Sequence, residues 1–171
     1  MNGREDKNAN NLFFLCSLIE YIGRKTKNHR NVVVNAIGKD GLQHIFDLAD
    51  VYHSENIDKL LFELTEKYNI ETGFFDNVAN AKYAIPTHWD IGKVYKRLIL
   101  DVNRRGEWHS PECRGVLHTP KSNSPEKLII DTLSEVYNSW LSRKIEDFNS
   151  SVYYESPEYL FQSYLKGEMI V

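Results

Sequence analysis

The chain is poor in cysteine and has no long apolar run, and each lack excludes a class of protein. Its 171 residues include two cysteines, Cys16 and Cys113, which are too few for a disulfide framework. No apolar stretch approaches the ~20 residues of a membrane-spanning helix, and Met1 to Asn11 is polar and mixed in charge, unlike a secretory signal. We therefore expect a cytoplasmic protein without a membrane segment, in which Cys16 is a buried thiol.

Familiar catalytic motifs are lacking as well. The sequence has no glycine-rich phosphate loop, no nucleophile elbow and no His-Glu-x-x-His pattern. Paired acids occur as Glu146–Asp147 and as Asp47 with Asp50, but acids on helices are usually solvated, and a general acid needs burial to raise its pKa. We expect no cofactor, and these absences favour a protein that is not an enzyme.

Apolar residues recur at helical spacing along most of the chain. The stripes with this spacing begin at Leu12, Leu42, Ile57, Ile91, Leu128 and Leu160. Ser54, Thr87, Ser124 and Ser156 are the residues expected to cap helix N-termini. The stripe from Leu128 continues to Ile145 and predicts one long helix over that range.

Residues 31–37 are ambiguous. Val32-Val33-Val34 favours a strand, whereas Ala36-Ile37 followed by Gly38 favours a short helix with a glycine stop; the neighbouring helices favour the helix. Together the patterns predict an all-α protein, a compact bundle of six to eight helices. We expect a single domain over residues 1–171, with the alternative of two sub-lobes, 11–70 and 87–171, joined by loop 71–86, which contains the aromatic pair Phe74-Phe75.

Charge is segregated along the chain, although the formal net charge is only −3. Residues 40–76 hold nine acids and two bases, residues 82–105 hold six bases and two acids, and residues 131–171 hold seven acids and three bases. Such segregation fits solvated helix faces of different sign. It also fits a basic surface that meets an acidic partner.

The basic helix predicted for residues 88–105 makes nucleic-acid binding an alternative function. Its bases are Lys93, Lys96, Arg97, Arg104 and Arg105, and a second basic group consists of Arg24, Lys25, Lys27 and Arg30. Residues 31–53 have the length of a helix–turn–helix, but the second helix carries Asp47 and Asp50, which phosphate would repel. Nucleic acid is therefore the less favoured partner.

Loop 106–123 is the longest irregular stretch in the predicted structure and offers a further alternative. The spacing His109-x3-Cys113-x4-His118 resembles a loose metal site, but zinc needs a fourth ligand, which only a distant residue could provide. Cys113 beside either histidine would also supply the residue types of a nucleophile and its base. A small metal- or Cys/His-dependent enzyme is thus a second, weaker alternative.

Aromatic residues are concentrated in the last third of the chain. Eight of the 21 aromatics lie between Tyr137 and Tyr164. Trp108 and the pair Tyr153-Tyr154 fall in predicted turns, and exposed aromatics of this kind anchor protein interfaces. We therefore expect a protein partner to contact Trp108, Tyr153 and Tyr154, together with the basic residues Lys93 and Arg97.

Part of the chain resembles a known family. The opening helix Phe13-Phe14-Leu15-Cys16-Ser17-Leu18-Ile19-Glu20-Tyr21, the run Asp50-Val51-Tyr52-His53-Ser54 and the amphipathic helix after it are similar to a small helical family of bacterial proteins of unknown function. The resemblance covers residues 12–68. Members of that family are often encoded in mobile elements beside a toxin that resembles ADP-ribosyltransferases. The resemblance assigns no catalytic residue and implies a protein-interaction module, an antitoxin or accessory partner of a neighbouring enzyme.

Overall fold

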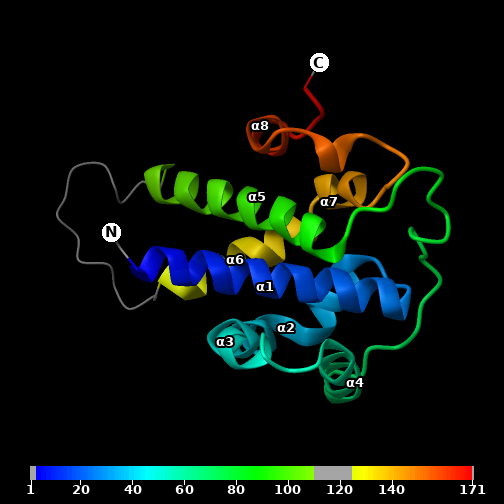
Figure 1. The fold of residues 1–171 in the computed structure, drawn as a ribbon. Helices are drawn as coiled ribbons and strands as arrows, with labels where there is room; N and C mark the ends of the chain where they lie inside the picture. The colour runs from blue at the N-terminus through cyan, green and yellow to red at the C-terminus, as the bar shows by residue number, and fades with distance from the viewer. Residues whose placement is uncertain (1–2, 110–124, 171) are drawn as a thin grey trace.

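The computed structural model describes residues 3–109 and 125–170, and in these ranges every regular element is a helix (Figure 1). The elements are α1 (Gly3–Thr26), α2 (Arg30–Asp47), α3 (Ala49–Tyr52), α4 (Ile57–Lys67), α5 (His88–His109), α6 (Pro125–Tyr137), α7 (Trp140–Ile145), the short 3-10 helix η2 (Val152–Tyr154) and α8 (Pro157–Lys166). The predicted all-α bundle is confirmed. None of the described helices combines the length and the apolar character needed to cross a bilayer.

Helix α1 runs through the middle of the bundle (Figure 1). Helix α5 lies along one side of α1 in the opposite direction, and α2 packs against another side; α3 and α4, on the same side as α2, also contact α1. Helix α6 bridges α2 and α5, and α8 covers the outer side of α5. The buried apolar side chains from residues 11–70 and 87–171 form one continuous core cluster.

A glycine lets α1 and α5 approach each other closely. A Cβ added at Gly92 of α5 would lie 2.0 Å from Ser17 Oγ and 2.8 Å from the Ser17 backbone nitrogen on α1. These contacts are too short for a real side chain, so the spacing of the two helices depends on the missing Cβ. Cys16, next to this contact, is fully buried as predicted, and burial raises its pKa to about 12.

Several predicted helix ends are confirmed. At the start of α5, the Thr87 hydroxyl accepts from the Asp90 backbone N–H at 3.0 Å while the Asp90 carboxylate accepts from the Thr87 N–H at 2.8 Å, which is a reciprocal capping box. Ser156 caps α8, and Gly167 ends it with φ 79°. The cap predicted at Ser54 is wrong, because Asn56 accepts from the first N–H groups of α4.

Residues 31–37 are helical, as the neighbouring helices favoured. They form the first part of α2, which is interrupted at Gly38, where φ is 74° and ψ is 165°. A positive φ of this kind favours glycine, so the glycine stop was a correct signal. The helix then resumes and ends at Asp47.

Two predicted boundaries require correction. The long helix expected over residues 128–145 is broken between α6 and α7, where Ser139 takes an extended ψ of 161° and both its N–H and its hydroxyl bond to the Val136 carbonyl. Serine can satisfy the helix end locally in this way, and the continuous apolar stripe concealed the break. Helix α5, in turn, continues to His109, so residues 106–109 of the predicted loop are helical and the basic helix is longer than residues 88–105.

Candidate functional site

The most unusual feature of the interior is a fully buried arginine. Arg30, the first residue of α2, is 0% exposed and forms an ion pair with Glu20 of α1, which is 1% exposed. The pair is bidentate: Nε of Arg30 donates to Glu20 Oε2 at 2.7 Å, and Nη2 donates to Oε1 at 2.8 Å. Arg24, half-buried one turn along α1, donates a further bond to Glu20 at 2.9 Å.

The remaining donors of Arg30 are also satisfied. Nη1 donates to the Asn28 carbonyl at 2.8 Å, and Nη2 donates to the Asn77 side chain at 3.1 Å. Burial opposes the charge on Glu20, but the guanidinium groups of Arg30 and Arg24 outweigh it and hold the pKa of that carboxyl below its ordinary value. The network therefore carries charge in the interior at neutral pH.

A second buried carboxylate caps α2. Glu146, which follows α7, is 3% exposed, and its Oε1 accepts from the Arg30 backbone N–H at 2.7 Å. Its Oε2 accepts from Nδ1 of His29, the N-cap residue of α2, also at 2.7 Å. An anion at this position satisfies an end N–H and opposes the helix dipole. The expectation that Glu146 is a solvated acid is thus wrong, although Asp147 is exposed.

The backbone of the loop after α4 forms hydrogen bonds next to this network, at the end of α1. The Gly73 N–H donates to the Thr26 carbonyl and the Phe75 N–H donates to the Lys27 carbonyl, both at 2.8 Å. Gly73 is required here, because a Cβ would lie 2.3 Å from the Asn28 side-chain oxygen. With residues 73 and 75 bonded, Phe74 between them is held with its side chain fully exposed.

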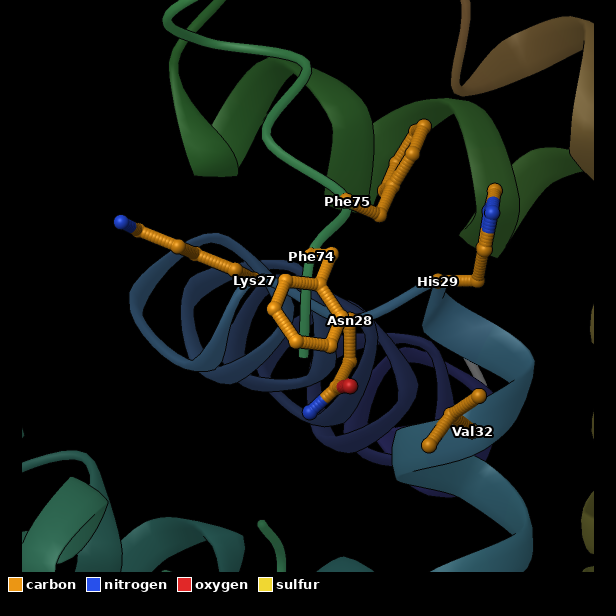
Figure 2. Close-up of a pocket in the computed structure, with 6 residues that line it drawn as sticks. All are labelled: Lys27, Asn28, His29, Val32, Phe74 and Phe75. Carbon is orange, nitrogen blue, oxygen red and sulfur yellow. The ribbon is translucent and has the colours of Figure 1, made fainter. Parts of the chain in front are cut away.

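A cleft of about 330 Å³ opens beside this loop, at the junction of α1 and α2 (Figure 2). It is lined by Lys27, Asn28, His29, Val32, Phe74 and Phe75. Phe75 stacks on the His29 ring, with the ring centroids 3.8 Å apart, and its ring centroid is also 5.7 Å from the Arg30 guanidinium carbon. The Phe75 ring, which forms an aromatic wall of the cleft, therefore packs against the Arg30 guanidinium of the buried ion pair.

Lys27, on the rim of the cleft, has an uncommon backbone conformation. It follows the last residue of α1 with φ 56°, and the next N–H, of Asn28, returns to the Gly23 carbonyl at 3.0 Å. This is the glycine position of a Schellman motif, occupied here by lysine. Across residues 7–105 and 128–170, whose side chains the structure describes, the Lys27 ammonium has no acidic group within salt-bridge distance.

The cleft presents groups that suit binding. His29 donates through Nδ1 to Glu146, which fixes the tautomer and leaves Nε2 as an acceptor when the ring is neutral. The apolar walls and the Lys27 ammonium can hold a ligand in the cleft.

The residues predicted to contact a partner do not line this cleft. Tyr153 is 6% exposed, packed edge-on to Phe148 and against Tyr154, so its predicted exposure is wrong. Tyr154 is exposed on η2, and Lys93 and Arg97 are exposed one turn apart on α5. Trp108 lies in α5 rather than in a turn, and its side chain is outside the described residues.

The predicted metal site is not part of the described structure. Cys113 and His118 lie outside the described residues, as does the side chain of His109, although its backbone belongs to α5. Among the residues that the structure does describe, no group of three or more His, Cys, Asp or Glu residues is arranged to hold a metal. The second basic group also needs correction, because Arg30 is buried and Arg24 is paired with Glu20.

Sequence reasoning missed the residues that build the cleft. Glu20 was detectable, since it is a charged residue in the middle of the buried stretch Leu12–Ile22, and an acid there needs a buried partner. No local pattern in the sequence indicates that Arg30 is the partner of Glu20 or that Glu146 joins the pair.

Comparison of the chain with protein-family models, curated proteins and solved structures found no match. The geometry of the cleft must therefore carry the functional argument.

Proposed function

We propose that the protein is a protein-interaction module that contacts its partner through the cleft and through Phe74. The supporting observation is that the Phe74 ring is exposed while the residues on either side of it, Gly73 and Phe75, donate backbone hydrogen bonds to Thr26 and Lys27. An aromatic side chain presented on a rigid support beside a cleft resembles the anchors that carry most of the energy in protein interfaces. The resemblance of residues 12–68 would make the partner an enzyme encoded nearby.

The rigidity of the support strengthens the proposal. Phe74 loses little backbone freedom on binding, because its neighbours are already bonded, and ordering costs are a main reason why large interfaces can be weak. Phe75 and Val32 supply apolar surface next to it. A partner would bury this surface together with the Phe74 ring.

We expect Phe74→Ala to weaken partner binding at least about tenfold, because removing an interface anchor costs about 2 kcal/mol or more. The measurement is a tagged pull-down from lysate of the source organism, treated with nuclease and quantified by mass spectrometry. Thermal stability should be unchanged, since the ring is solvent-exposed.

Two variants serve as comparators in the same pull-down. Phe62→Ala removes an exposed phenylalanine of α4, away from the cleft, and should leave recovery unchanged. Tyr154→Ala tests the contact site predicted from the sequence. If a protein is still recovered with Phe74→Ala but is lost with Tyr154→Ala, the interface lies at η2 and the proposal that the cleft binds the partner is contradicted.

A second candidate function, nucleic-acid binding, has one supporting observation. Burial, together with the neighbouring charges of Arg97 and Lys93, lowers the pKa of Lys96, so three cations lie close together on α5. If this cluster binds phosphate, affinity for a single-stranded or duplex oligonucleotide should fall steeply with salt and be lost in Lys93→Glu plus Arg97→Glu. Affinity that does not change with salt, or that is unchanged in the double variant, would exclude this cluster as a nucleic-acid-binding surface.

A further inference from the structure

We propose that the occupant of the cleft is a protein segment that places an apolar side chain between Phe75 and Val32 and an acidic side chain beside Lys27. This inference rests on the proposed function, and it adds the chemistry of the partner. It follows from the lining of the cleft, from the backbone conformation of Lys27 and from the groups that are already satisfied.

The lining is apolar and basic. Val32, Phe74 and Phe75 supply apolar or aromatic surface, Lys27 supplies a cation, and no acidic residue lines the cleft. The volume of about 330 Å³ is near the lower end for ligand sites, enough for one large side chain and its neighbours. An apolar group with an adjacent carboxylate complements such a lining.

The lining groups differ in whether they are available to a ligand. Asn28 is buried, and its side-chain nitrogen already donates to Thr26 Oγ1 at 3.0 Å and to the Glu71 carbonyl at 2.7 Å. His29 Nδ1 is committed to Glu146. Lys27 is exposed and forms no ion pair with the acidic side chains described in residues 7–105 and 128–170, so it is the charged group able to meet a carboxylate. Figure 2 shows Lys27 and His29 on either side of the two phenylalanines.

The backbone at Lys27 supports a role for its side chain. A residue with a Cβ is disfavoured relative to glycine at φ 56°, and glycine is the usual residue at this position of the Schellman motif. A lysine there is unfavourable for folding. An ammonium needed at the rim of the cleft would account for it.

The variant Lys27→Gly separates folding from binding. It relieves the positive φ and removes the charge, so we expect the melting temperature to stay the same or rise while affinity falls. A lysine that served only the fold would give no loss of affinity. Lys25→Gly is unsuitable as a control because it lies inside α1; Lys67→Ala, an exposed lysine at the end of α4, removes a charge elsewhere.

The probe is a phage-displayed library of short random peptides, selected on the full chain and counter-selected on Phe74→Ala. We expect enriched peptides to carry an acidic residue next to an aromatic or large aliphatic one. Measured by fluorescence anisotropy, their affinity should fall about three- to tenfold in Lys27→Gly, fall with added salt, and be unchanged in Lys67→Ala.

The other outcomes of the peptide selection distinguish a failure of this inference from a failure of the proposed function. Peptides that require Phe74 but show no acidic preference, or bind Lys27→Gly as tightly as the wild type, would overturn this inference and leave the proposed function standing. Peptides that bind Phe74→Ala equally well would contradict the proposed function itself. A selection that enriches no peptide would overturn the inference that a short segment suffices, whereas the pull-down would still test the interface.

Discussion

Arg30→Met is expected to lower the free energy of unfolding by about 3–5 kcal/mol, the largest single effect in this protein. The substitution keeps most of the side-chain volume but leaves Glu20 buried without its bidentate partner. It also removes the donors that satisfy the Asn28 carbonyl and the Asn77 side chain. Urea denaturation followed by circular dichroism measures the change.

The matched control is a surface ion pair. Lys39 and Asp131 are 3.0 Å apart with both side chains about half exposed, so Lys39→Met should change stability by less than about 1 kcal/mol. In the double variant Glu20→Met plus Arg30→Met, much of the loss should be recovered, because neither charge of this pair is left in the interior without the other. If Arg30→Met and Lys39→Met cost the same, the buried pair does not hold the bundle together.

The cost of Arg30→Met should also depend on pH. The pKa of Glu20 lies below its ordinary value of 4.5 because the attraction of Arg30 and Arg24 outweighs burial. A lowered carboxyl pKa contributes stability that is fully present above the unfolded-state pKa and is lost as pH falls through the folded-state pKa. The difference between wild type and variant should therefore be largest at high pH and shrink as pH falls. Without Arg30, burial raises the Glu20 pKa of the variant, so Glu20 takes up a proton and the variant gains stability already above 4.5, whereas the wild type loses stability only below 4.5.

Gly92→Ala is expected to cost about 2 kcal/mol, by forcing α1 and α5 apart. The new methyl group would meet the Ser17 hydroxyl at 2.0 Å and the Ser17 backbone at 2.8–2.9 Å, and overpacking of this kind typically costs about 1–3 kcal/mol. Alanine is intrinsically better than glycine in a helix by about 1 kcal/mol, so an observed loss means that the clash is larger than that gain.

Two variants test the cause of this loss. Ser17→Gly combined with Gly92→Ala removes the hydroxyl clash but not the backbone contacts, so it should recover only part of the loss. Lys93→Ala, an exposed change at the next position of α5, should be neutral within about 0.5 kcal/mol. A stability gain in Gly92→Ala would show that the helices are not held at this spacing.

Much of the fold was predictable because its signals are local. The capping box of Thr87 and Asp90 and the serine cap before Pro157 each involve residues within one helical turn. Residues 31–37 were assigned to a helix because the neighbouring segments are helical, and the break at Gly38 agrees with the local glycine signal. The predictions failed at Ser54, where Asn56 two residues later is the cap, and at Ser139, whose own bonds to the Val136 carbonyl end the helix.

The candidate site was much less predictable, because its partners are distant in sequence. Glu146 lies 116 residues from the N–H that it caps, and Asn77 lies 47 residues from the guanidinium that it accepts from. Phe74 and Tyr153 illustrate the same difficulty. Both are aromatic residues outside long helices, yet Phe74 is fully exposed and Tyr153 is buried, with its hydroxyl directed at the Ala84 carbonyl 69 residues away.

The sequence by itself determined that this protein is an all-α bundle, that α5 begins after Thr87 and α8 lies between Ser156 and Gly167, and that Cys16 is buried. These properties follow from apolar periodicity and from hydrogen bonds between near neighbours. Only the tertiary structure decided that Arg30 and Glu146 are interior groups, that α1 and α5 meet at Gly92, and that Lys27 and Phe74 border one cleft. The physical reason is that burial and charge pairing depend on which surfaces meet when the helices pack, and residues far apart in the chain supply those surfaces.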